Sequence, residues 1–75
     1  MEFHPGDRVY HTRKRGYATV VYQITKFTTL IEFDDKIGEY HPKCKPGYAW
    51  RADTDLLQLV SEAPDDTPIN IENLI

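Results

Sequence analysis

The sequence lacks the two features that most often stabilise very small proteins or attach proteins to membranes. It contains a single cysteine, Cys44, so no disulfide can form within the chain. No apolar run approaches the roughly 18 residues that cross a bilayer, and the first residues, MEFHPGDRV, form neither a basic start nor an apolar signal segment. We therefore expect a cytoplasmic protein without a membrane segment, stabilised by packing.

The sequence also lacks an excess of one charge over most of its length. Residues 1–60 hold nine Lys or Arg against eight Asp or Glu, whereas residues 61–75 hold four acids and no base. The net charge of −3 therefore arises in the second segment. Overall charge does not favour nucleic-acid binding, so any such activity would require one local face.

What is present suits one small folded domain. Hydrophobic residues make up 40% of the 75 residues and charged residues 28%, which is typical of globular proteins rather than disordered ones. A chain of this length has no room for a second core.

Five short segments rich in β-branched and aromatic residues are separated by polar turns about every ten residues. The turn chemistry is clearest in the PGD sequence that precedes the first segment. This pattern predicts an all-β fold, a small five-stranded barrel. The predicted strands are Arg8–Thr12, Tyr17–Ile24, Thr28–Phe33, Tyr48–Ala52 and Gln58–Val60.

Alternation within the first segment places Val9 and His11 on one face of the strand and Tyr10 on the other. The sequence does not decide which of the two faces points inward.

Two less regular segments connect the later strands. Residues 39–47 contain two prolines and are predicted to form a loop, with at most a brief strand around Tyr40. Asp53 stands ahead of Leu56 and Leu57, which predicts one turn of 3₁₀ helix with the Asp53 side chain capping its backbone donors.

The composition changes after the last predicted strand. The sequence SEAPDDTP is predicted to be an acidic linker. It leads to a hydrophobic tail with Ile69, Ile71 and Leu74, which we expect either to bind a partner or to pack back onto the barrel. The predicted organisation is a barrel at 1–60 followed by the linker and tail at 61–75.

Four motifs occur in a familiar order: PGDRV at residues 5–9, GYATV at 16–20, IEFDD at 31–35 and ADTDLL at 52–57. Together they resemble the SH3-like barrels, and among them the KOW, Tudor and CarD-like domains. The resemblance covers roughly residues 3–60 through short motifs, so it supports a fold more than a function. In those families the basic, glycine-containing segment after the first strand often approaches RNA or a polymerase surface, which implies a similar role here.

The connection at residues 13–16, Arg-Lys-Arg-Gly, is the main candidate binding site. Its cations can contact phosphates, and neighbouring tyrosines offer rings on which bases can stack. The alternative is that charges at a hairpin turn only keep a strand edge soluble. Further cations would extend the site if they lay on the same face. The candidate residues for binding nucleic acid or an acidic partner are Arg13, Lys14, Arg15, Tyr17, Lys43, Lys45 and Arg51.

A Tudor-type function would require at least three aromatic rings that converge around a methylated cation, and the sequence does not show that they do. The candidate rings are Tyr10, Tyr17, Tyr22, Tyr40, Tyr48 and Trp50.

The sequence provides little support for metal binding or catalysis. His41 and Cys44 have the two-residue gap of a zinc knuckle, but His4 and His11 are separated by six residues and do not complete it. Adjacent acids such as those in FDD are typical of turns, and no phosphate-binding glycine loop or nucleophile motif accompanies them. We expect a non-enzymatic protein without a cofactor or a metal.

Two functions remain. The first is a non-catalytic binding module that docks onto a protein or nucleoprotein assembly, such as transcription machinery, through the basic connection. The alternative is a protein adaptor or inhibitor, for instance one encoded by a phage or mobile element, that uses an aromatic face and the hydrophobic tail.

Overall fold

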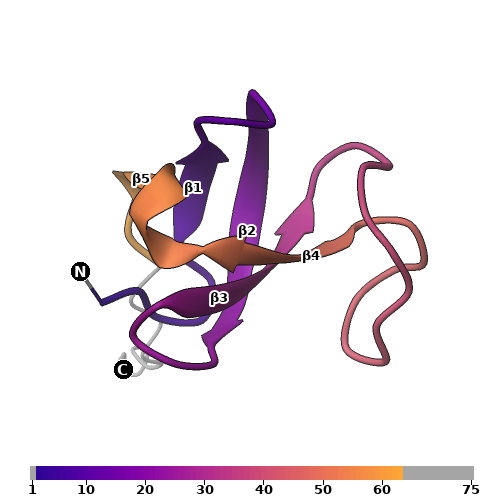
Figure 1. Ribbon diagram of the computed structural model, residues 1–75, viewed down its shortest axis with the longest axis horizontal. Coiled ribbons are helices and arrows are strands. Elements are labelled where there is room, and N and C mark those ends of the chain that lie inside the picture. The colour runs from indigo at the N-terminus through magenta and orange to yellow at the C-terminus, as the bar shows by residue number, and fades with distance from the viewer. Residues whose placement is uncertain (1, 64–75) are drawn as a thin grey trace, which may run out of the picture.

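The computed structural model describes residues 2–63, which form one five-stranded antiparallel sheet and a single 3₁₀ turn (Figure 1). The predicted all-β class is confirmed, and each predicted strand boundary lies within one residue of the observed one. Within this range no helix is long and apolar enough to span a membrane. The elements are β1 (Arg8–His11), β2 (Gly16–Gln23), β3 (Thr28–Phe33), β4 (Ala49–Asp53), η1 (Thr54–Leu56) and β5 (Leu57–Ser61).

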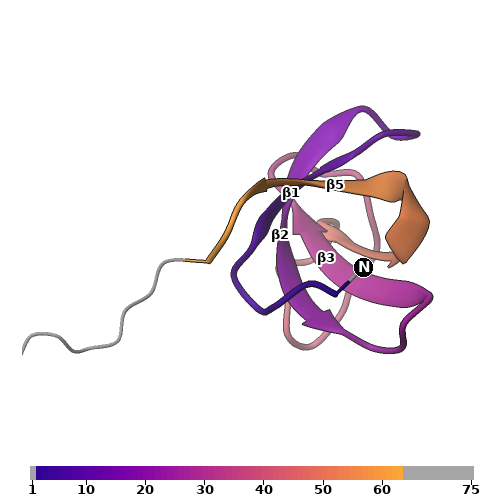
Figure 2. The same cartoon turned by 90° about the vertical axis from the view of Figure 1, so that its left-hand side faces the viewer.

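The strand order in the sheet is β4-β3-β2-β1-β5. The first four strands pair with their neighbours along the chain, and β5 returns to pair with β1. The short turn η1 therefore joins the two edge strands of the sheet (Figure 2). Register shifts in the β2–β3 and β1–β5 pairings mark irregularities of the bulge type, which increase local twist and help a sheet to coil.

The inner face of the sheet holds the hydrophobic core. Val9 of β1 is fully buried and packs in one cluster with Val20, Ile31 and Phe33 from the next two strands. Full burial of side chains of this kind stabilises a fold by about 1.5–3 kcal/mol each. His11 is buried beside this core as well, so the face that Val9 and His11 share is the inward face.

The turn between β1 and β2 differs from the sequence-based expectation in the role of its glycine. The turn comprises residues 12–15, and Gly16 is already the first residue of β2. The left-handed backbone position is occupied by Arg15, with φ of 60°. The Arg15 amide donates a hydrogen bond to the His11 carbonyl oxygen at 2.7 Å, which closes the turn.

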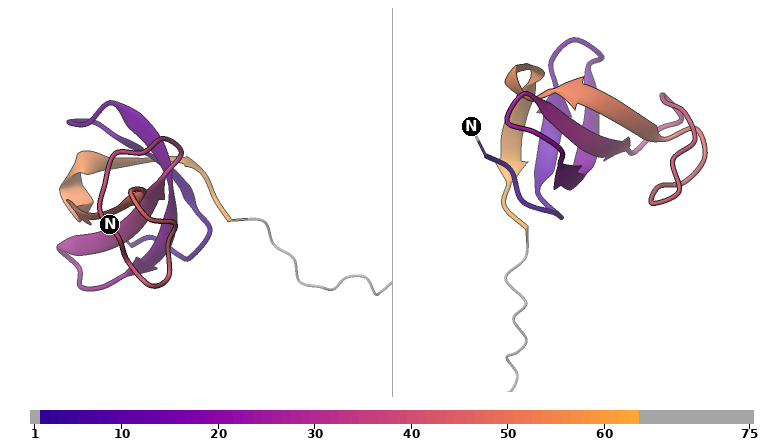
Figure 3. Two further views of the ribbon diagram at one scale, coloured as in Figure 1. Left: turned by 90° about the vertical axis from the view of Figure 1, so that its right-hand side faces the viewer. Right: turned by 60° about the horizontal axis from the view of Figure 1, so that its bottom comes forward.

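Residues 34–48 connect β3 to β4 and form a long loop that extends from the sheet at one end of the molecule (Figure 3). Its base is narrow, because the Gly38 amide donates to the Gly47 carbonyl oxygen and Glu39 forms an isolated bridge with Ala49. The brief strand predicted around Tyr40 is thus a single bridge at the preceding residue. A Cβ atom on Gly38 would overlap the Ala49 carbonyl oxygen, so only glycine fits there.

The 3₁₀ turn forms where the sequence predicts it, but Asp53 does not cap it. Asp53 occupies the N-cap position without a side-chain hydrogen bond to the turn, and its side chain is exposed. The turn is fixed from inside instead, by a 2.8 Å hydrogen bond between the buried hydroxyls of Thr29 and Thr54.

The buried Asp7 side chain ties the two ends of the described chain together. Its carboxylate accepts hydrogen bonds from the backbone amides of His4, at 2.9 Å, and Ala63, at 2.7 Å. The PGD turn predicted from sequence therefore also holds the segment that follows β5. The predicted tail contacts at Ile69, Ile71 and Leu74 lie outside the described residues.

Candidate functional site

Three of the predicted binding residues meet at one corner of the molecule. Arg13 and Lys14 from the β1–β2 turn and Arg51 from β4 line a hollow of about 220 Å³ together with Trp50. We call these four residues the basic corner. Arg51 is far from the other two cations in sequence, and the three meet because β4 is brought beside the β1–β2 turn by the coiling of the sheet.

Trp50 forms the wall of the basic corner. The partly buried tryptophan packs against the hydrophobic core, which restricts the movement of its ring. The Lys14 ammonium lies over the ring, 4.1 Å from its centroid. An exposed cation–π contact of this kind is worth about 0.5–1 kcal/mol, so it positions Lys14 without locking it.

The buried His11 side chain stabilises the β1–β2 turn, which we call the basic turn, through a hydrogen bond to its backbone. Its Nδ1 accepts a hydrogen bond from the Lys14 backbone amide at 3.0 Å, so the neutral ring carries its proton on Nε2. Burial lowers the pKa of His11 from its usual value of 6.5, and the charges of Lys14 and Arg13 lower it further, whereas Asp53 opposes this effect. A neutral His11 therefore holds the basic turn in shape at neutral pH.

The cations of the basic corner have no carboxylate partner in the part of the chain that the structure describes. Within residues 2–63 the one ion pair joins Arg8 to Asp34, with nitrogen–oxygen distances of 2.9 and 2.7 Å. This contact holds the pKa of Asp34 below its usual value. Asp53 is the acid that lines the hollow of the basic corner, and its side chain is exposed.

The other predicted cations lie elsewhere. Lys43 and Lys45 belong to the β3–β4 connection, where Lys43 lies 4.8 Å from the ring centroid of Tyr22 and Lys45 lies 5.8 Å from that of Tyr48. Lys45 lines a separate hollow that also contains Glu32 and Asp34. The seven candidate residues are therefore divided between at least two regions.

The aromatic candidates are also dispersed. Tyr10 and Tyr17 form an edge-to-face pair with centroids 5.0 Å apart, and Tyr17 is half exposed. Among residues 2–63 no third aromatic ring contacts this pair.

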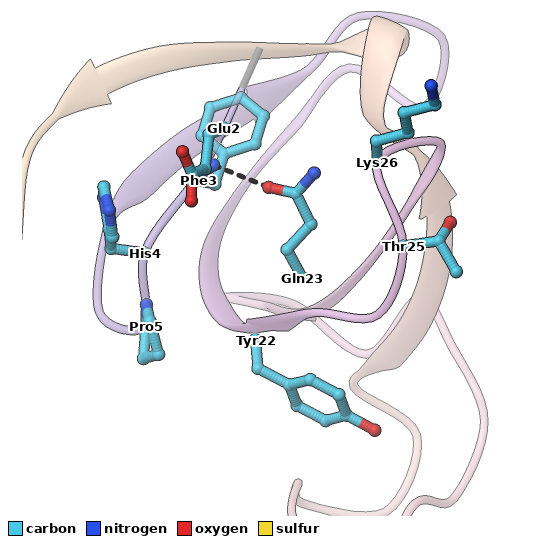
Figure 4. A pocket seen from close by; sticks show the side chains of 8 residues that line it. All are labelled: Glu2, Phe3, His4, Pro5, Tyr22, Gln23, Thr25 and Lys26. Carbon is cyan, nitrogen blue, oxygen red and sulfur yellow. Dashed lines mark hydrogen bonds between the residues drawn. The ribbon is translucent and has the colours of Figure 1, made fainter.

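A larger open hollow, of about 730 Å³, lies between the N-terminal segment and the β2–β3 turn (Figure 4). Gln23 spans it from β2, and its side-chain oxygen accepts a hydrogen bond from the Phe3 amide at 2.7 Å. The charged residues of its lining are Glu2 and Lys26, whose side chains make no hydrogen bond with each other in the described chain. No pattern in the sequence indicated this hollow, because its lining comes from two separate segments.

The residues capable of binding zinc are dispersed. His11 is buried under the basic turn, His41 accepts a hydrogen bond from the Lys43 amide, and burial raises the pKa of the Cys44 thiol. Among residues 2–63 no three His, Cys, Asp or Glu side chains gather in a way that could hold a metal ion.

Comparison with known protein families, with curated proteins and with solved structures finds no significant match to this chain. Function is therefore inferred from the residues and their geometry.

Sequence reasoning underestimated Trp50 and His11. It treated Trp50 as one of six possible cage rings and His11 as a possible metal ligand, whereas the first forms the wall of the basic corner and the second supports the turn. The alternation in the first strand could have indicated that His11 is buried. Val9 and His11 share one face of the strand, so His11 is buried if Val9 belongs to the core.

Proposed function

We propose that this chain is a non-catalytic binding module, a small SH3-like barrel that docks onto a nucleoprotein or protein assembly, such as transcription machinery, through its basic corner. The returning strand β5, which pairs with β1 after a 3₁₀ turn, supports the proposed barrel. The basic corner supplies the electrostatic contact to an anionic partner.

The observation that carries this proposal is the convergence of Arg13, Lys14 and Arg51 around one hollow without a carboxylate ion pair in the described chain. Charges that only keep a strand edge soluble need not converge with cations from another strand. Unpaired cations gathered at one site attract an anionic partner from solution, although the protein as a whole is acidic.

The direct test replaces the three cations together, in the variant Arg13→Ala/Lys14→Ala/Arg51→Ala. Binding to nucleic acid or heparin, measured by fluorescence anisotropy at low salt, is expected to fall by about a hundredfold, because ionic contacts to phosphates dominate such affinities. The slope of log affinity against log salt should become shallower by about 0.7–0.9 for each phosphate that the variant no longer neutralises.

The matched control is Lys26→Ala/Lys36→Ala/Lys43→Ala, which removes the same charge from exposed positions outside the basic corner. An equal reduction of affinity in both triple variants would show that general charge, and not the corner, drives binding. The proposal would then be wrong.

The second candidate is a protein adaptor or inhibitor. It is favoured by Leu59 and Val60 on the edge strand β5, whose side chains are 42% and 53% exposed. Apolar side chains on an edge strand are suited to contact with another protein. A wild-type protein with no retention on heparin and no affinity for any nucleic acid would favour this candidate over the first.

A further inference from the structure

Trp50 offers one ring face to a partner. Trp50 is partly buried against the hydrophobic core, and Lys14, an exposed residue on a turn, lies over its ring. A lysine side chain has several rotatable bonds and can leave the ring without any change in the sheet. A ligand can therefore reach the ring of Trp50 once the Lys14 side chain moves away from it.

We propose that the basic corner binds single-stranded nucleic acid, and that one unpaired base stacks on Trp50 in place of the Lys14 ammonium. Neighbouring phosphates then contact Arg13 and Arg51, which line the same hollow. The displaced Lys14 remains close enough to contact a phosphate as well. This inference rests on the proposed function and names the partner of that same site.

The chemistry of the site favours single strands over duplexes. Every base has a π-face that can stack on an aromatic ring, and such stacking is generally stronger than an exposed cation–π contact. In a duplex these faces are covered by the neighbouring base pairs, so a base reaches a ring only if it is flipped out. A double helix could contact the cations but would leave Trp50 covered by Lys14.

An acidic protein surface is also less suited to the whole site. Its carboxylates would pair with Arg13, Lys14 and Arg51, yet such pairing leaves no role for the ring that lies among them. A combination of one anchored ring and several unpaired cations is typical of surfaces that follow a single-stranded backbone.

Asp53 disfavours a phosphate at one part of the hollow. Its carboxylate lines the hollow beside the cations and repels a phosphate there. The phosphates are therefore directed to Arg13 and Arg51, whereas the Asp53 oxygens can accept a hydrogen bond from the amino group of a base. We expect Asp53→Asn to bind an oligonucleotide of any sequence more tightly, by about threefold, because the repulsion between like charges is removed.

The single tryptophan of the chain makes a direct experiment possible. The intrinsic fluorescence of Trp50 is recorded while the full chain is titrated with a single-stranded DNA of about 12 nucleotides, the equivalent RNA, the same DNA as a duplex, and heparin. Base stacking is expected to quench the fluorescence with both single strands. Heparin and the duplex should bind with little quenching, because neither presents an open base.

The variant pair Trp50→Phe and Trp50→Leu separates stacking from packing. Both variants keep an apolar side chain toward the core, but only phenylalanine keeps an aromatic face. The affinity for labelled single-stranded DNA, measured by anisotropy, should fall by about tenfold or more in Trp50→Leu and by much less in Trp50→Phe. Heparin affinity, which depends on the cations, should fall less than the affinity for single-stranded DNA in Trp50→Leu. Circular dichroism spectra that match the wild type show that both variants remain folded.

The outcomes distinguish this inference from the function on which it rests. Equal affinity for single strands, duplex and heparin without selective quenching would overturn base stacking and leave the basic corner as a general anion site. Binding of acidic proteins but not of nucleic acids would overturn the inference as well. No binding to any polyanion would overturn both proposals.

Discussion

At the scale of single residues, Arg15 carries the clearest sign of local strain in the basic turn. It is the non-glycine residue with positive φ among residues 2–63, and a left-handed backbone is unfavourable for a side chain that has a Cβ. Strained positions that persist in a fold often serve function. Arg15 therefore adds a cation to this turn at a conformational cost that glycine would not have.

The first prediction follows from this strain. Arg15→Gly should raise the free energy of unfolding by about 0.5–1 kcal/mol, since glycine adopts positive φ without a steric penalty, and it should weaken binding to polyanions. Urea denaturation measures the first effect and anisotropy the second. Arg13→Gly is the control, because Arg13 does not have positive φ and glycine there brings no such gain. Equal stability of Arg15→Gly and the wild type would contradict the assignment of strain.

The second prediction concerns His11 and pH. Its pKa is lowered in the folded protein by burial and by Lys14 and Arg13, with Asp53 acting in the opposite direction. The unfolded chain therefore takes up the proton first, so stability is fully present above the ordinary pKa of 6.5 and is lost as pH falls from there through the lower folded pKa.

Urea unfolding of the wild type at about pH 7.5 and about pH 5 should show this decrease in stability, whereas His11→Gln should show a smaller one. The comparison variant His4→Gln makes the same substitution at an exposed histidine outside the core. If His11→Gln keeps the full pH dependence, His11 is not the group responsible.

At the scale of elements, the strands were predictable and several details of their connections were not. Alternation and β-branched residues define β1, β2 and β3, because side chains that share a face repeat every two residues. Local residue preferences place glycine at a left-handed position and aspartate at a helix cap. They therefore did not predict the positive φ at Arg15 or the absence of a cap at Asp53. The meeting of Arg51 with Lys14 depends on sheet coiling, which no local pattern encodes.

The third prediction concerns the connection between β3 and β4. Gly38→Ala should lower the free energy of unfolding by about 2–4 kcal/mol, because the added Cβ overlaps the Ala49 carbonyl oxygen and forces the backbone apart. Gly16→Ala is the matched control, as its Cβ would lie 3.4 Å from the nearest side-chain atoms of Ile37 and Phe33. Thermal denaturation of both variants measures the difference in stability. Equal melting temperatures would contradict the predicted overlap at Gly38.

At the scale of the whole molecule, the Asp7 carboxylate links the N-terminal segment to the chain that follows β5. The fourth prediction compares two truncations, after residue 63 and after residue 61. The shorter protein should be less stable by about 1–3 kcal/mol, because it leaves one oxygen of a buried carboxylate without the Ala63 amide. Denaturant unfolding measures the difference, and two equally stable truncations would show that this link contributes little.

The central claim of this account is that an acidic protein presents one basic corner, built from a turn and an edge strand around Trp50. Amide and indole NMR shifts of the ¹⁵N-labelled full chain, recorded during titration with single-stranded DNA, test it most directly. The account predicts that the largest shifts occur at Arg13, Lys14, Arg51 and the Trp50 indole N–H. Largest shifts in the β3–β4 connection or on β5, with the basic corner unchanged, would contradict it.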